Sequence, residues 1–173
     1  HRQTHTMADV RQEQNSDGMG EFCRRKGLRA IDKEVIMEQE IIQPVSRELL
    51  KRELTPERRM RMTNKSHNEI YVVTAQEAPN VMLEIGRLRE EAFRTAGGGT
   101  GKSADIDEFD TMENGCRQLI VWNPEEEEII GGYRYLIGTD WKIDDKGQPV
   151  LATSHMFHFS EKFMTQYAPY TVE

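Results

Sequence analysis

The sequence lacks any apolar run that approaches the roughly 20 residues needed to cross a bilayer. Its opening residues, His1-Arg2-Gln3-Thr4-His5, lead into no hydrophobic stretch of the kind found in signal peptides. Cysteine is scarce, because Cys23 and Cys116 lie far apart without a partner motif, which predicts neither a disulfide framework nor a zinc site. We therefore expect a cytoplasmic protein without a metal centre.

An excess of basic charge is also missing. The 173 residues include 23 Lys and Arg against 30 Asp and Glu, for a net charge of −7. Proteins that bind nucleic acid generally neutralise phosphates with surplus Lys and Arg, so this balance argues against that class. Any basic surface for a partner must therefore be local.

The first part of the chain lacks a helical or strand period. From His1 to about Lys33 it is polar and punctuated by glycine, which is typical of a disordered or non-native leader. Met37 is a plausible natural start because a more regular stretch begins there. We divide the chain into a leader, residues 1–40, and one domain, residues 41–173.

Within that domain, helical and strand patterns alternate. Two adjacent glycines inside an expected strand, Gly131 and Gly132, indicate a bulge or a close approach of another backbone or ligand. The expected elements are a helix over Arg47–Leu54, a second helix starting at Thr55-Pro56, a strand over Glu69–Thr74, an amphipathic helix over Pro79–Arg94, a hairpin of Arg117–Trp122 and Glu128–Ile137, a strand over Ser154–Phe159, a short helix over Glu161–Tyr167, and the start of a strand at Tyr170–Glu173.

A local basic surface is expected on the first two helical segments. One interpretation is a solvated helical face with interleaved acidic residues, and the other is a docking surface for an acidic partner such as a carrier protein or an anionic membrane. The basic residues are Arg47, Lys51, Arg52, Arg58, Arg59, Arg61 and Lys65.

A glycine-rich stretch, Ala96–Ser103, satisfies a permissive form of the phosphate-binding loop pattern. Such a loop follows a buried strand and opens a helix whose N–H groups point at the phosphates. Here an amphipathic helix precedes the loop, and the residues that follow, Ala104–Asp110, carry four acids that would repel a nucleotide. We expect a mobile glycine loop instead of a nucleotide site.

Charged residues on both sides of this loop form a candidate site. Three carboxylates within six residues repel one another and need a cation, an arginine or solvent to offset the cost. An Arg–Asp pair that fastens the loop to the sheet and a site for a substrate ammonium are both consistent with the pattern. The residues are Arg89 and Phe93 in the helix, Asp105, Asp107 and Asp110 after the loop, and Arg134 in a strand.

The order and spacing of these residues carry a resemblance. Arg89-x-x-x-Phe93, Asp105-x-Asp107-x-x-Asp110, the arginine of IIGGYRY and a late Glu resemble the acyl-homoserine-lactone synthases of the Gcn5-related N-acetyltransferase (GNAT) superfamily. The stretches EIGRLREEAFRTAGGGTGKSADIDEFD and IVWNPEEEEIIGGYRYLIG resemble more strongly a hemolysin-like family. That family includes acyl-carrier-protein-dependent N-acyltransferases of ornithine-lipid and glycine-lipid synthesis. The resemblance spans Ile41 to Glu173.

The resemblance implies an α/β (α+β) fold, with a mixed, largely antiparallel sheet flanked by helices and an acyl thioester in a cleft between splayed strands. It implies attack by an amino-acid amine on the thioester of acyl carrier protein or coenzyme A, with no permanently bound cofactor. Peripheral contact with the inner membrane is a separate expectation. By similarity Glu173 is the base, Arg134 fixes the acidic cluster, Asp105, Asp107 and Asp110 hold the amine or the loop, and Arg89 and Phe93 shape the acyl opening.

The sequence also departs from the family pattern. The tryptophan that follows the phenylalanine in lactone synthases is absent, which argues against lactone signalling. The family continues past the late Glu into a strand and a pantetheine-binding loop and helix, so we expect a C-terminally truncated fragment that is inactive alone. A non-catalytic domain that binds lipid or carrier protein and an acetyl-coenzyme A-dependent N-acetyltransferase are the alternatives.

Overall fold

In the computed structural model of the protein, residues 38–173 are described. The leader prediction for residues 1–37 therefore lies outside the described residues. Residues 38–40, which we assigned to the leader, contact the domain, since the Gln39 N–H donates to the Gly101 carbonyl at 2.8 Å. The Gln39 side-chain oxygen also accepts from the Ser103 N–H at 3.0 Å.

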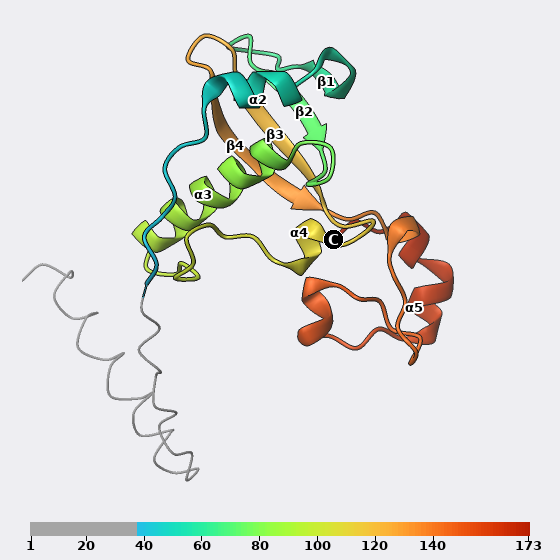
Figure 1. Cartoon of the computed structure of the whole chain (residues 1–173). Helices are drawn as coiled ribbons and strands as arrows, with labels where there is room; N and C mark the ends of the chain where they lie inside the picture. The colour runs from blue at the N-terminus through green and yellow to red at the C-terminus, as the bar shows by residue number, and fades with distance from the viewer. Residues whose placement is uncertain (1–37) are drawn as a thin grey trace, which may run out of the picture. The chain divides into compact units, whose positions relative to one another are not determined.

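A four-stranded antiparallel sheet in the order β1-β2-β3-β4 forms the centre of the fold. Helices α2 and α3 lie on one face of this sheet (Figure 1). The strands are β1 (Arg59–Met62), β2 (Glu69–Val73), β3 (Arg117–Asn123) and β4 (Glu128–Tyr135), and the helices are α2 (Arg47–Glu53), α3 (Pro79–Thr95), α4 (Glu108–Thr111) and α5 (Glu161–Gln166). The predicted α/β class, an antiparallel sheet flanked by helices, is confirmed.

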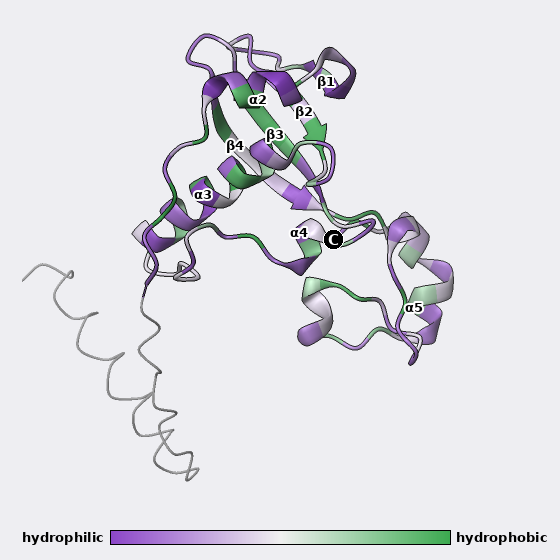
Figure 2. Ribbon diagram, in the orientation of Figure 1, coloured by the Kyte–Doolittle hydropathy of each residue, from purple (hydrophilic) through white to green (hydrophobic). Residues whose placement is uncertain are grey.

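The main core lies between the sheet and these two helices. Alternate residues of β3 are buried, so Ile120 and Trp122 face inward, and Val81 and Ile85 of α3 pack against them with Tyr71 of β2. Figure 2 shows the apolar positions of β2 and β3 in green beneath the helices. No helix within residues 38–173 has the length and apolar character that a membrane span requires.

Two predicted elements are wrong. The helix expected after Thr55-Pro56 is a single 3-10 turn, Pro56–Arg58, followed by the edge strand β1. The strand expected over Ser154–Phe159 is a 3-10 turn, Ala152–His155, followed by irregular chain. There the Ser154 hydroxyl donates to the Pro149 carbonyl and accepts from the Leu151 N–H, and such local bonds compete with strand pairing.

Two other predictions agree with the structure, a bulge in β4 and an extended segment at Tyr170–Glu173. Val121 pairs with Gly131 while Trp122 pairs with Ile129, so Ile130 is an extra residue and the predicted bulge is present. The segment Tyr170–Glu173, where the sequence predicted the start of a strand, pairs with the residues that follow β4. Ile137 and Val172 form an antiparallel bridge, and the backbones of Leu136 and Glu173 exchange two hydrogen bonds of 3.0 Å.

The start of α3 depends on a side chain from α2. Ala78, at the N-cap, has no side-chain acceptor for the free N–H groups of the first turn. The Glu53 carboxylate replaces the cap, accepting from the N–H groups of Asn80 at 3.2 Å and Val81 at 2.8 Å. A carboxylate at a helix N-terminus also interacts favourably with the helix dipole. Glu53 therefore joins the two helices that cover the sheet.

We predict that Glu53→Ala lowers the free energy of unfolding by about 1–2 kcal/mol, because the first turn of α3 loses its cap. Urea denaturation followed by circular dichroism measures the change. Glu57→Ala, at an exposed position of the neighbouring turn, is the control and should change stability by less than about 0.5 kcal/mol. Equal effects of the two substitutions would show that Glu53 does not cap α3.

Candidate functional site

Arginine and aspartate side chains from three separate elements meet at one point. Arg134 of β4 contacts Asp107 at 2.8 Å and Asp110 at 3.2 Å. Arg89 of α3 contacts Asp105 at 3.2 Å and Asp110 at 3.1 Å. The structure thus brings together five of the residues singled out in the sequence, which we call the Arg–Asp cluster.

The short helix α4 orients the acidic side of this cluster. The Asp107 carboxylate caps the helix by accepting from the N–H groups of Phe109 at 2.9 Å and Asp110 at 3.2 Å. In return the Asp110 carboxylate accepts from the Asp107 N–H at 3.2 Å, which completes a capping box. The spacing Asp107-x-x-Asp110 therefore orients both carboxylates through hydrogen bonds to the local backbone, in addition to their contacts with the arginines.

Asp110 is fully buried, so its charge needs several partners. Besides the two arginines, the side-chain amide of Gln118 donates to it at 2.9 Å. Gln118 is buried on the core-facing side of β3, and sequence analysis missed it. A polar residue at an inward position of an alternating strand was the signal that could have identified it.

The charges of the cluster are strongly coupled. Burial alone would lower the pKa of Arg134, but hydrogen bonds and charge from Asp107 and Asp110 raise it above its ordinary value. Burial would raise the pKa of Asp107, but the hydrogen bond and charge of Arg134 lower it. Three carboxylates and two guanidinium groups leave a net charge of −1. The fastening Arg–Asp pair is therefore present, and residual negative charge remains for an ammonium.

A second buried carboxylate, Glu90 of α3, holds the glycine-rich loop. It accepts from the Thr100 N–H at 2.9 Å, the Thr100 hydroxyl at 2.6 Å and the Gly101 N–H at 2.8 Å. Arg94 pairs with the same carboxylate at 2.8 Å. The loop that we interpreted as mobile is thus anchored, and a carboxylate of the chain itself occupies N–H groups that a phosphate would need.

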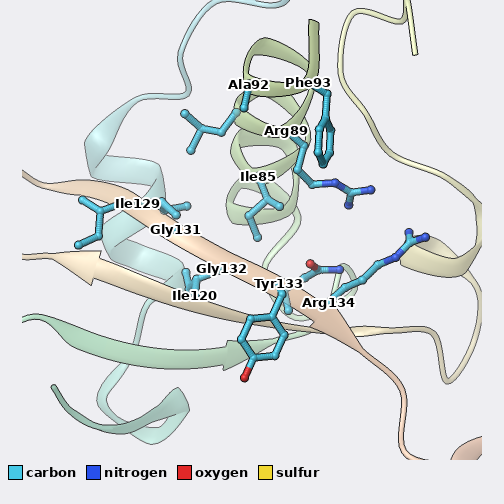
Figure 3. Close-up of a pocket in the computed structure, with 13 residues that line it drawn as sticks. Ile85, Arg89, Ala92, Phe93, Ile120, Ile129, Gly131, Gly132, Tyr133 and Arg134 are labelled. Atoms are coloured by element: carbon cyan, nitrogen blue, oxygen red, sulfur yellow. The ribbon is translucent and has the colours of Figure 1, made fainter. Parts of the chain in front are cut away.

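An open cavity of about 370 Å³ lies between α3 and β4, beside the Arg–Asp cluster (Figure 3). Arg89 and Phe93 project from α3 and Arg134 from β4 at one end, whereas the remaining wall is largely apolar. The cavity is lined by Ile85, Leu88, Arg89, Ala92, Phe93, Gln118, Ile120, Ile129, Ile130, Gly131, Gly132, Tyr133 and Arg134. The cavity is therefore an apolar groove with the guanidinium groups of Arg89 and Arg134 at one end.

Glu173 lies outside the ion pairs of the cluster. Its side-chain Oε1 accepts from the Thr153 N–H at 2.8 Å and from the Thr153 hydroxyl at 2.6 Å. Burial of the Cys116 thiol, together with the charges of Asp110, Glu173 and Asp107 and against the opposing charge of Arg134, raises the pKa of this thiol to about 11. The side-chain hydrogen bonds of Glu173 among the described residues are thus made to Thr153 and not to the Arg–Asp cluster. Sequence analysis missed Thr153.

The basic residues predicted to dock a partner do not form one helical face, because β1 follows the turn after α2. Lys51 pairs with Glu127 at 2.6 Å and Arg59 with Glu69 at 2.7 Å, while Arg58 donates to the Glu53 carbonyl at 2.6 Å. Within the described residues, the side chains of Arg47 and Arg52 have no ion-pair partner and remain exposed. Within residues 38–173, no group of three or more His, Cys, Asp and Glu side chains is placed to hold a metal ion.

Comparison with known proteins adds to this geometry. Residues 88–170 match the family model described as acetyltransferase (GNAT) domain. These residues support placement in the GNAT superfamily. The match includes Arg89, the three aspartates and Arg134, so the Arg–Asp cluster lies within the GNAT-matched region. No solved structure gives a significant match.

Two curated proteins are similar to this chain over a longer stretch than the family model matches. The chain is 70% identical over 135 residues to a glycine N(alpha)-acyltransferase from Bacteroides thetaiotaomicron, and 67% identical over 135 residues to one from Phocaeicola vulgatus. Each alignment covers 78% of this chain. The chain spans about 40% of the length of these relatives.

We predict that Glu90→Gln lowers the free energy of unfolding by about 1–3 kcal/mol at neutral pH, because the loop N–H groups lose a charged acceptor. Burial would raise the pKa of Glu90, but hydrogen bonds from Thr100, Arg94 and Gly101 lower it to about 2 from 4.5. The stability due to the charge is therefore present above pH 4.5 and is lost as pH falls toward 2.

Urea denaturation across this pH range should show the difference between wild type and Glu90→Gln shrinking with acid. Glu91→Gln is the matched control, since this neighbour on α3 is exposed. A difference that stays constant with pH would mean that the Glu90 charge does not hold the loop.

Proposed function

We propose that this chain forms the reaction site of an N-acyltransferase that moves a fatty acyl group from a thioester to the amine of an amino acid. The observation that carries the proposal is an apolar groove ending at the Arg–Asp cluster, on residues that match the GNAT domain. The groove suits an acyl chain, and the cluster suits the charged reactants of amide formation.

The reaction joins the amine nitrogen to the thioester carbonyl carbon and breaks the carbon–sulfur bond, releasing a thiol. The amine must lose a proton, so a base is required. Glu173 is the proposed base, by resemblance to the lactone synthases. Thr153 donates both of its hydrogen bonds to one oxygen of this carboxylate, and the second oxygen is left to accept the proton.

Glycine is the proposed acceptor because two relatives about 70% identical are named glycine N(alpha)-acyltransferase. The resemblance to the hemolysin-like family adds ornithine as the second candidate. In both cases the product is an N-acyl amino acid of the kind used in membrane lipids. Contact with the inner membrane surface would then bring the acyl product to its destination.

Acyl carrier protein is the proposed donor, with acyl-coenzyme A as the alternative. Carrier proteins are acidic, and the exposed guanidinium groups of Arg47 and Arg52 offer positive charge without an ion-pair partner among the described residues. Such complementary charge speeds association and fixes orientation. No permanently bound cofactor is needed, because the thioester itself supplies the activated acyl group.

The cavity favours a fatty acyl group over an acetyl group. Ligand sites of this kind typically range from about 300 to 1,000 Å³, and an acetyl group would leave most of the exposed apolar wall, including Phe93 and Ile130, in water. A non-catalytic domain that binds lipid or carrier protein would share the groove but would need no base. Turnover therefore separates the two candidates.

We predict that the protein at its natural full length releases free thiol from acyl carrier protein thioester only when glycine or another acceptor is added. Glu173→Gln should lower kcat by about 10²–10⁴-fold, because the amide cannot take the proton. Asp107→Ala and Arg134→Ala should abolish release, since each breaks the Arg–Asp cluster. A thiol-reactive dye measures the rate, and circular dichroism checks folding.

Glu161→Gln, at the exposed start of α5, is the matched control and should retain wild-type kcat. Wild-type turnover by Glu173→Gln would reject the assignment of the base. Carrier-protein binding without turnover by the wild type would favour the non-catalytic domain.

We predict that the double substitution Arg47→Glu with Arg52→Glu raises KM for acyl carrier protein thioester by at least about 10-fold, because a complementary charge becomes repulsive. KM for acyl-coenzyme A should change little, since this donor does not need the carrier-protein surface. Lys146→Glu, in the turn before Gly147, is the control. An equal change for both donors would show that Arg47 and Arg52 do not dock the carrier protein.

A further inference from the structure

The two arginines at the charged end of the cavity are only partly used by the protein. Arg89 donates through Nε to Asp105 and through Nη1 to Asp110. Arg134 donates through Nη1 to Asp107 and forms its ion pair with Asp110 through the same nitrogen. Among the described residues, no acceptor contacts Nη2 of Arg89 or Nε and Nη2 of Arg134. Because a guanidinium group carries five N–H donors, each arginine retains donors after its ion pairs are made.

These free donors are accessible from the cavity. The side chains of Arg89 and Arg134 are 23% and 25% exposed, and both line its wall. In Figure 3 the two guanidinium groups extend to the same side, and the ring of Phe93 lies alongside Arg89. The planar N–H pairs of guanidinium match the two oxygens of a carboxylate.

The charge of the surroundings limits what such donors can bind. The Arg–Asp cluster carries a net charge of −1, so an isolated anion would be repelled. A zwitterion avoids this cost, because its ammonium offsets the acidic side chains while its carboxylate meets the arginines. Asp105 uses only Oδ2 in its contact with Arg89, and Oδ1 has no partner among the described residues.

We propose that the free N–H groups of Arg89 and Arg134 bind the α-carboxylate of the acceptor, while Asp105 and Asp107 hold its ammonium next to the acyl groove. This inference rests on the proposed function and deepens it by assigning the residues that recognise the α-carboxylate of the amino-acid acceptor. Arg89 and Arg134 are then specificity-determining residues as well as fasteners of α4.

Discrimination between glycine and glycinamide tests the assignment, because glycinamide keeps the amine and removes the carboxylate charge. Full-length wild-type protein should use glycine with a kcat/KM about 10- to 100-fold higher than glycinamide. Arg89→Gln should raise KM for glycine and bring the ratio close to one. Arg89→Lys keeps the charge without the planar donor pair and should give an intermediate ratio.

Arg87→Gln is the matched control, because Arg87 lies on the same helix but pairs with Glu84 and Glu91 away from the cavity. It should leave the ratio unchanged. If Arg89 served only to fasten α4, Arg89→Gln would slow both acceptors equally, and an unchanged ratio would overturn the inference.

A second measurement separates this inference from the proposed function. Titration calorimetry of the full-length protein with glycine and with glycinamide reports carboxylate recognition without any acyl donor. Glycine binding that weakens about 10- to 100-fold in Arg89→Gln supports the inference even if acyl transfer is absent. Equal binding of glycine and glycinamide by the wild type overturns it even if acyl transfer is present.

Discussion

The burial of the Asp110 carboxylate is the constraint on which the site depends. A buried charge costs several kcal/mol unless it is paired and hydrogen-bonded, so Asp110 requires Arg89, Arg134 and Gln118 at the same point. These three partners belong to α3, β4 and β3. One carboxylate thereby fixes the distance between the helix and the sheet, and the cavity lies between the same two elements.

A second buried carboxylate, Glu90, is the residue after Arg89 on α3 and also depends on hydrogen bonds and an ion pair. Its buried carboxylate accepts from the loop N–H groups of Thr100 and Gly101, and these hydrogen bonds offset part of the entropic cost of ordering three successive glycines. The phosphate-loop pattern in the sequence is therefore explained by an internal anion. Because the loop leads directly to Asp105 and Asp107, its anchoring also places the acidic side of the cluster.

The cavity combines two environments that a reaction between an acyl chain and an amino acid requires. Its apolar wall removes hydrocarbon from water, and its charged end provides hydrogen bonds for polar groups. After the bulge at Ile130, Gly131 and Gly132 line the groove with backbone alone. The irregular part of β4 therefore contributes to the shape of the cavity.

Local sequence determined much of this protein. Apolar periodicity predicted α3 and the β3–β4 hairpin, and the order of arginines and aspartates indicated the site, because these signals depend only on neighbouring residues. Prediction from the sequence was wrong at Ser154–Phe159, where local hydrogen bonds of Ser154 compete with strand pairing, and at β1, which follows a short turn at Pro56. Only the tertiary structure showed that Gln118 contacts Asp110, that Glu90 holds the glycine-rich loop and that Thr153 contacts Glu173. A buried polar side chain is selected by partners distant in sequence, and no local pattern specifies which distant groups will meet.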